Sequence, residues 1–115
     1  MSTLLNFQSD IKGFNSFAAP LSTDKYSATL AAAGNSTVTV PSNYENWVVS
    51  FSFQPGADVW VAYNTSAAAP VGSTFASTTS ELLPGSRAIL KGTTINCYNN
   101  GAGVADVGII LYAIS

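Results

Sequence analysis

The sequence predicts an all-β fold: a single antiparallel sandwich of about eight strands, for which a jelly roll is the best description. Two observations support this fold class. Apolar and polar residues alternate with a period of two in several short segments, and clusters of Gly, Pro, Asn and Ser separate these segments. No helical pattern is evident after residue 20. A closed barrel gives the same pattern, because one sequence does not determine strand order.

The first expected strands, residues 26–32 and 37–40, flank Ala33-Gly34-Asn35-Ser36, which has the residue types of a hairpin turn. The clearest strand spans residues 47–54, where large apolar side chains alternate with smaller or polar ones. Pro55-Gly56-Ala57 then turns the chain into the next expected strand, residues 58–64.

A long segment of small residues, 65–80, interrupts the strands and contains a single aromatic residue, Phe75. Loops of this length in compact domains are usually functional or cross between sheets. The segment 99–103, Asn-Asn-Gly-Ala-Gly, is the strongest hairpin-turn signal in the chain. The remaining expected strands are residues 81–83, 87–91, 94–98 and 105–113.

Residues 1–25 are expected to form an irregular N-terminal arm, and residues 26–115 the sandwich domain. The apolar residues of the arm follow neither the strand period nor the helix period, and Pro20 interrupts them. Such side chains must be buried, either in the arm's own sandwich or in a neighbouring subunit, and the sequence leaves both options open. The candidate residues for a capsid or subunit interface are Leu4, Leu5, Phe7, Phe14 and Phe17 of the arm and Phe75 of the long segment.

The composition excludes several functions. The 115 residues include 4 Lys+Arg and 6 Asp+Glu, so the net charge of −2 argues against a nucleic-acid partner. With no His and one Cys, the chain can build neither a tetrahedral zinc site nor a His-based catalytic triad. Calcium held by Asp58 and Asp106 is a minor alternative without a supporting motif. We therefore predict a non-enzymatic protein with no cofactor, no bound metal and no catalytic residues.

The first ten residues contain neither a basic region nor an apolar run, so we expect no secretory signal. The longest apolar stretch is far shorter than the roughly 20 residues that span a bilayer, so no membrane partner is expected. Cys97 lies alone in a strand-like segment and is interpreted as a buried structural thiol. These features predict a protein that is made in a cytoplasm.

The aromatic residues offer a different function. Trp60, flanked by Tyr44 or Tyr98, is the candidate platform for stacking a sugar ring. Trp47 shares the apolar side of its strand with Val49, which is more typical of a core residue.

Five strand and turn segments between residues 44 and 113 carry a resemblance to a known class of proteins. They are Trp47-Val-Val-Ser-Phe-Ser-Phe53, Ala57-Asp-Val-Trp-Val-Ala-Tyr63, Glu81-Leu-Leu-Pro-Gly-Ser-Arg87, Thr94-Ile-Asn-Cys-Tyr98 and Val107-Gly-Ile-Ile-Leu-Tyr-Ala113. In the order and residue types of these segments, this region resembles the small all-β decoration or cement proteins of tailed-bacteriophage capsids. The N-terminal arm lies outside the resemblance.

The resemblance implies a virion structural protein, made in the host cytoplasm, that binds the outer capsid surface as a homodimer or homotrimer. Its implied partners are the major capsid protein and further copies of itself, and such modules have no defined catalytic residues. Related patterns also appear in phage head-fibre and tail proteins. The alternative is therefore a carbohydrate- or receptor-binding module that uses Trp60, Tyr44 and Tyr98. The neutral Ser/Thr/Ala-rich composition suits a surface that is covered by a partner, because little hydration is lost.

Overall fold

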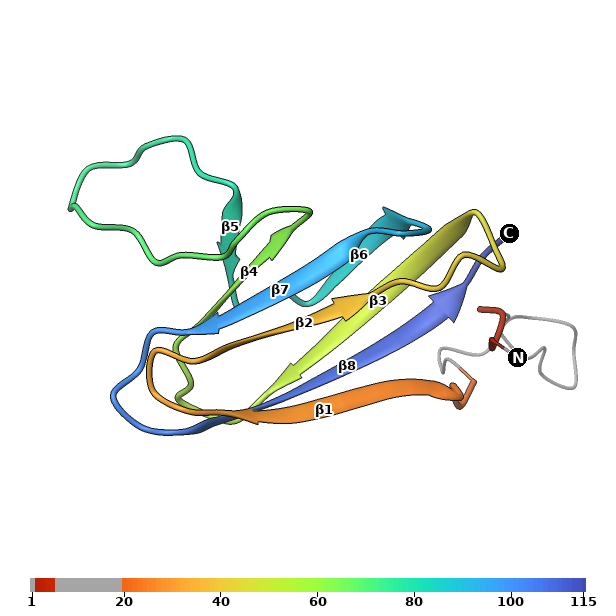
Figure 1. The fold of residues 1–115 in the computed structure, drawn as a ribbon, viewed down its shortest axis with the longest axis horizontal. Coiled ribbons are helices and arrows are strands. Elements are labelled where there is room, and N and C mark those ends of the chain that lie inside the picture. Colours follow the sequence, from red (N-terminus) through yellow and green to blue (C-terminus); the bar gives the residue numbers. More distant parts are fainter. Residues whose placement is uncertain (1, 6–19) are drawn as a thin grey trace, which may run out of the picture.

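Two antiparallel sheets of four strands face one another in the computed structural model, which describes residues 2–5 and 20–115 (Figure 1). One sheet has the strand order β1-β8-β3-β6 and the other the order β2-β7-β4-β5. The strands are β1 (Asp24–Leu30), β2 (Asn35–Thr39), β3 (Asn46–Phe53), β4 (Val59–Tyr63), β5 (Ser80–Leu82), β6 (Ser86–Leu90), β7 (Thr94–Asn99) and β8 (Ala105–Ala113). The predicted all-β sandwich character is confirmed.

Alternation of large apolar and small residues explains why β3 forms and which face it buries. Trp47, Val49 and Phe51 are buried, whereas Ser52 on the other face is exposed. Successive side chains of a strand point to opposite faces, so one face of β3 packs against the second sheet. β3 starts and ends one residue earlier than the predicted range 47–54.

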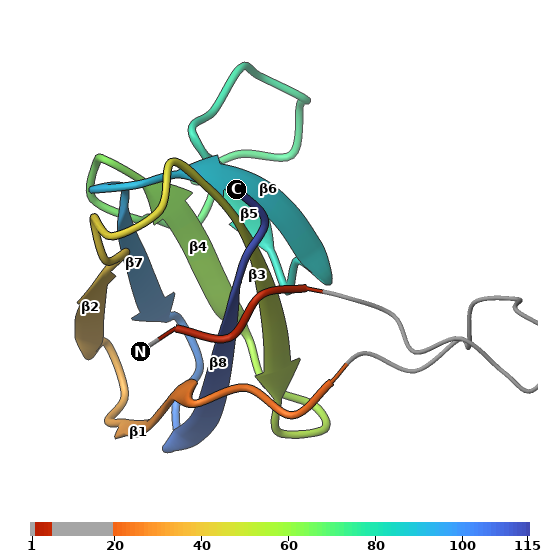
Figure 2. The same cartoon turned by 90° about the vertical axis from the view of Figure 1, so that its right-hand side faces the viewer.

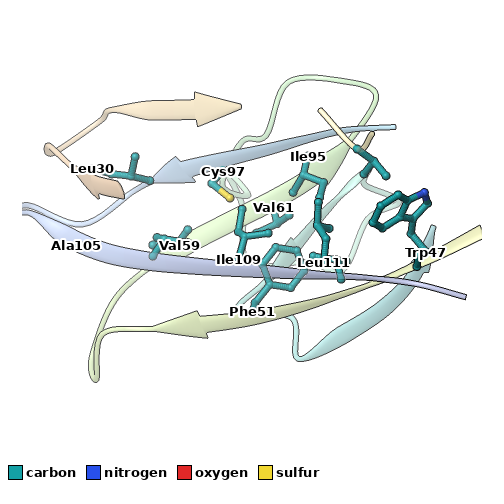
Figure 3. Packing of buried hydrophobic residues seen from close by; sticks show 14 residues of the cluster. Leu30, Trp47, Phe51, Val59, Val61, Ile95, Cys97, Ala105, Ile109 and Leu111 are labelled. Carbon is teal, nitrogen blue, oxygen red and sulfur yellow. The ribbon is translucent and has the colours of Figure 1, made fainter. Parts of the chain in front are cut away.

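The core fills the space between the sheets and draws residues from both (Figure 3). Leu111 of β8 and Ile95 of β7 are fully buried, and so is the Trp47 side chain. The Trp47 indole Nε1 donates a 3.0 Å hydrogen bond to the Tyr44 carbonyl, so its polar atom is satisfied inside the core. Each fully buried Val, Leu or Ile side chain contributes about 1.5–3 kcal/mol of stability.

The short turn at residues 31–34 crosses between the sheets, so the predicted hairpin is wrong. β1 pairs with β8 and β2 pairs with β7. Ala33 adopts the left-handed conformation, with φ of 58°, while Asn35 already belongs to β2. Gly34 is required for a different reason, since a Cβ there would lie 2.8 Å from the Ala31 carbonyl oxygen. Turn-forming residues permit a chain reversal, but the pairing of β2 with β7 places the next strand in the other sheet.

The segment after β7 also connects the two sheets and is not the hairpin that its glycines predict. Asn99 is buried at its start, and its Nδ2 donates to the carbonyls of Leu30 (3.0 Å), Ala31 (3.2 Å) and Gly103 (2.8 Å). Its Oδ1 accepts a 2.9 Å bond from the Gly101 amide. One amide side chain therefore ties together two of the sheet-to-sheet connections, residues 31–34 and 100–104.

The long loop between β4 and β5, in contrast, connects two strands of the same sheet. β4 and β5 are hydrogen-bonded neighbours in one sheet, so residues 64–79 form an extended hairpin loop rather than a crossover between sheets. The loop projects away from the body of the sandwich (Figure 1).

Both described ends of the N-terminal arm contact their own domain (Figure 2). The amide of Ala113 donates to the Thr3 carbonyl (2.8 Å), and the amide of Leu5 donates to the Ala113 carbonyl (2.7 Å). The Tyr112 hydroxyl donates a 2.6 Å bond to the Pro20 carbonyl. β1 begins at Asp24, within the range expected for the arm. Phe7, Phe14 and Phe17 lie outside the described residues.

Candidate interaction surfaces

The tip of the 64–79 loop presents two large apolar side chains to solvent. Val71 and Phe75 have relative exposures of 105% and 106%, so neither gains burial from its own fold. The base of the loop is fixed: the Ala68 amide donates to Ser80 Oγ (3.0 Å), and Asn96 Nδ2 donates to the Thr65 carbonyl (2.6 Å). A fixed base with an exposed apolar tip is typical of a segment that contacts a partner.

A second group of exposed apolar residues lies at the end of the sandwich where β3 starts and β8 ends. Leu4 is 38% exposed, and Leu5 is half-buried. Leu90 is the register partner of Asn46, whose carbonyl accepts a 2.8 Å bond from the Ile114 amide. Leu90 and Ile114, which sequence analysis missed, are 61% and 47% exposed. Their signal was weak because each ends the apolar run of its strand, Leu90 after Ile89 and Ile114 after Ala113.

Trp60 and Tyr98 lie side by side on the outer face of the β2-β7-β4-β5 sheet. They are register partners on β4 and β7, and both are half-buried. Their strand neighbours Val59, Val61 and Cys97 belong to the core, so the two aromatic side chains point outward.

The same row of this face continues with Asn35 next to Tyr98 and Leu82 next to Trp60. The Trp60 indole is held in place by Asp58, because Nε1 donates a 2.9 Å hydrogen bond to Asp58 Oδ1. Asn100 Nδ2 donates to the other carboxylate oxygen, also at 2.9 Å. An oriented aromatic pair is therefore bordered by amide and carboxylate groups.

Tyr44 does not join this pair. Its ring packs edge-on against Trp47, with centroids 6.2 Å apart, and its carbonyl accepts the Trp47 indole bond. The structure therefore brings Trp60 and Tyr98 together and places Tyr44 against the core. Sequence alternation shows on which face a side chain lies but not which strands become neighbours.

Asp58 and Asp106, the two carboxylates considered for calcium, have local hydrogen-bond partners. The Asp58 carboxylate binds Trp60 and Asn100, and Asp106 Oδ1 accepts a 2.6 Å bond from the Thr29 hydroxyl. Burial raises the pKa of the Cys97 thiol to about 11, so the nucleophilic thiolate is scarce at neutral pH. Within residues 2–5 and 20–115, no three His, Cys, Asp or Glu side chains are grouped to hold a metal ion.

Among these same described residues there is no helix with the length and hydropathy needed to cross a bilayer. Comparisons with protein-family models, curated proteins and solved structures give no match.

Proposed function

We propose that this protein is a non-enzymatic structural module of a bacteriophage virion that binds the outer capsid surface and cements or decorates the major capsid lattice. The observation that carries the proposal is the pair Val71 and Phe75, fully exposed on a projecting loop with a fixed base. A capsid surface that covers them would remove apolar area from water, and full burial of such a side chain contributes about 1.5–3 kcal/mol.

We also propose that the sandwich is a jelly roll. In that fold, eight strands wind so that most successive strands alternate between two sheets. The strand orders β1-β8-β3-β6 and β2-β7-β4-β5 are compatible with this winding, with β4 and β5 adjacent in one sheet. Jelly rolls occur in viral capsid proteins and in lectins, so the fold suits both this function and its alternative.

The surface chemistry supports a module that is permanently covered. Only 9% of the residues are charged, so few strongly hydrated groups would be desolvated on binding. The loop itself is built largely from Ser, Ala and Thr around its two large apolar residues. Such a segment can fit closely against a neighbouring surface.

The proposal is tested with purified shells that lack the protein. Recombinant protein should saturate these shells at a stoichiometric, symmetric copy number, measured by mass spectrometry and electron microscopy. The double variant Val71→Ser with Phe75→Ser should lose at least about tenfold in affinity, since about 1.4 kcal/mol corresponds to a factor of ten. Thr74→Ser, in the same exposed loop, is the matched control and should bind normally. Undiminished binding of the double variant would overturn the loop assignment, and absence of the protein from virions would overturn the function.

The Trp60–Tyr98 pair favours a second candidate, a carbohydrate- or receptor-binding module of a phage head fibre or tail. A flat aromatic surface stacks on the apolar face of a sugar ring, and Asn35, Asp58 and Asn100 can bind its hydroxyls. This function predicts binding on a glycan array that is lost in Trp60→Ala and kept in Tyr44→Phe. A folded protein that binds no glycan on the array would exclude sugar recognition.

A further inference from the structure

The two long edges of the sandwich are built differently. At the β5/β6 edge, Glu81 and Arg87 form an ion pair of 2.6 Å between the sheets. At the β1/β2 edge, the sheets leave an opening with a volume of about 230 Å³. It is lined mainly by apolar residues of β1, β2, β7 and β8, among them Tyr26, Ala28, Val38, Cys97 and Ile109. The inner face of the sandwich is therefore accessible along β1.

Every second residue of β1 also has backbone groups that do not bond to β8. The hydrogen bonds that β8 makes on its two sides show which residues of β1 these are. The amide and carbonyl of Ala113 bond to Thr3 and Leu5, which extend the side of β8 where β1 lies. Backbone groups alternate in direction along a strand, so Ile109 and Val107 also face β1 and bond to Tyr26 and Ala28.

The amides and carbonyls of Lys25, Ser27 and Thr29 consequently point away from β8 and lie on the outer edge of the sheet. The opposite side of β8 agrees with this assignment, because the Asp106 carbonyl accepts a 3.0 Å bond from the Gln54 amide after β3. No strand among the described residues pairs with β1 on its outer edge. A seven-residue edge strand without proline is a ready template for a further strand.

We propose that β1 pairs antiparallel with β1 of a second copy of this chain, about a two-fold axis through Ser27. This register overlaps the whole strand with itself and joins all three free residues, with Ser27 opposite Ser27 and Lys25 opposite Thr29. On the inner face, this register places the large Tyr26 of each copy opposite the small Ala28 of the other copy. Tyr26 is 40% exposed in the single chain, so pairing buries apolar surface beside the opening.

Charge complementarity favours a second copy as the occupant. Lys25 belongs to neither ion pair of the described residues, which are Arg87–Glu81 and Lys91–Glu45. On the outer face, Lys25 of one copy would lie opposite Thr29 of the other copy. In that other copy Asp106 is the register partner of Thr29 on β8, and its carboxylate accepts a hydrogen bond from the Thr29 hydroxyl. The two-fold axis thus sets two lysines near two carboxylates. The dimer is a property of the free chain, so its test is independent of attachment to a capsid.

Disulfide trapping tests the register. In a Cys97→Ala background, Ser27→Cys should form a covalent dimer under mild oxidation. Hydrogen-bonded partners in an antiparallel pair have Cα atoms about 5.5 Å apart, within the range that a disulfide spans. Thr29→Cys is the matched control on the same edge and face, and should not crosslink because the register separates its two copies by about 14 Å. Crosslinking at residue 29 and not at residue 27 would overturn the register.

Sedimentation velocity over a concentration series tests the dimer itself. The unmodified chain and Ser27→Ala should dimerise, whereas Ser27→Pro should stay monomeric because it removes a free amide at the centre of the edge. That amide makes no bond to β8, so Ser27→Pro should keep its fold, checked by circular dichroism. Lys25→Glu should weaken the dimer, and adding Asp106→Lys should restore it. A monomeric unmodified chain at every concentration, or a dimeric Ser27→Pro, would overturn the proposal.

Discussion

Arg87 and Glu81 bind each other although their strands belong to different sheets. Arg87 Nε and Nη2 donate to Glu81 Oε2 at 2.9 Å and 2.6 Å. Arg87 is the register partner of buried Val49, and Glu81 that of buried Val61, so both side chains start on the inner faces. The pair therefore closes the edge of the sandwich where each sheet ends.

The first prediction is that this ion pair contributes little to stability. Both side chains remain largely in water, with exposures of 44% and 36%, and solvent screens such pairs strongly. A double-mutant cycle with Arg87→Met and Glu81→Gln, measured by urea unfolding, should give a small coupling free energy that shrinks further in high salt. A large coupling that salt does not reduce would show that the edge depends on this pair.

The second prediction concerns Tyr63, which is half-buried on the inner face of β4. Its hydroxyl oxygen is buried and makes no hydrogen bond of normal geometry among the described residues, although the Glu81 carboxylate lies near it. Burial, and secondly the charge of Glu81, raise the pKa of this phenol above its usual range. Tyr63→Phe removes a polar atom that makes no hydrogen bond of normal geometry, so stability should be unchanged or rise by up to about 1 kcal/mol. Thermal unfolding measures this, and a loss above about 1 kcal/mol would indicate a bond that the hydroxyl makes in solution.

The third prediction is that Cys97 destabilises the fold in alkali. Its thiol pKa rises from 9.0 to about 11 in the folded chain because of burial. Below pH 9 the thiol is protonated in both states, so its contribution to stability is complete. As the pH rises from 9 to about 11, the unfolded chain loses the proton first and the free energy of unfolding falls. At 1.36 kcal/mol per pH unit, the loss is about 2 to 3 kcal/mol.

Urea unfolding at successive pH values measures this loss. Cys97→Ala removes the titrating group, so its stability should fall less steeply between pH 9 and pH 11 than that of the unmodified chain. Identical slopes for the two proteins would mean that the thiol is not protected from ionising in the folded state.

The fourth prediction is that Asn99 is a major contributor to stability outside the apolar core. Asn99→Ala leaves three carbonyl acceptors and one amide donor without their partner, and the bond to the Leu30 carbonyl is buried while the other three are part-buried. We expect a loss of about 2–3 kcal/mol in thermal or urea unfolding. Asn43→Ala, at an exposed site bonded to Ser2, should cost less than about 0.5 kcal/mol. Equal effects of the two substitutions would contradict the bridging role of Asn99.

Much of the strand content could be predicted from the sequence, because alternation along a strand is local. In β3, burial of Trp47 and Val49 against exposure of Ser52 is the pattern the residues themselves show. The connections could not be predicted in the same way. The turn-type residues near Gly34 and Gly101 mark reversals correctly, but hydrogen bonding across the molecule decides that these segments cross between sheets.

The candidate surfaces show the same division. Phe75 was identifiable because it is a lone aromatic residue in a loop of small side chains. Pairing of Trp60 with Tyr98 rather than Tyr44 depends on β4 and β7 being neighbours, which no local pattern encodes. The role of Asn99 could not be predicted because asparagine is as typical of an exposed turn as of a buried position that bonds to two segments.

The central place of β8 between β1 and β3 has a consequence for biosynthesis. Residues 24–30 find their partner strand, and residues 47–53 their second one after β6, only when residues 105–113 have been made, so that sheet cannot complete while the ribosome is still adding its last strand. Such non-local pairing slows folding and leaves unpaired edges exposed on the nascent chain. We therefore expect chains arrested before residue 105 to depend on chaperones and to aggregate when released.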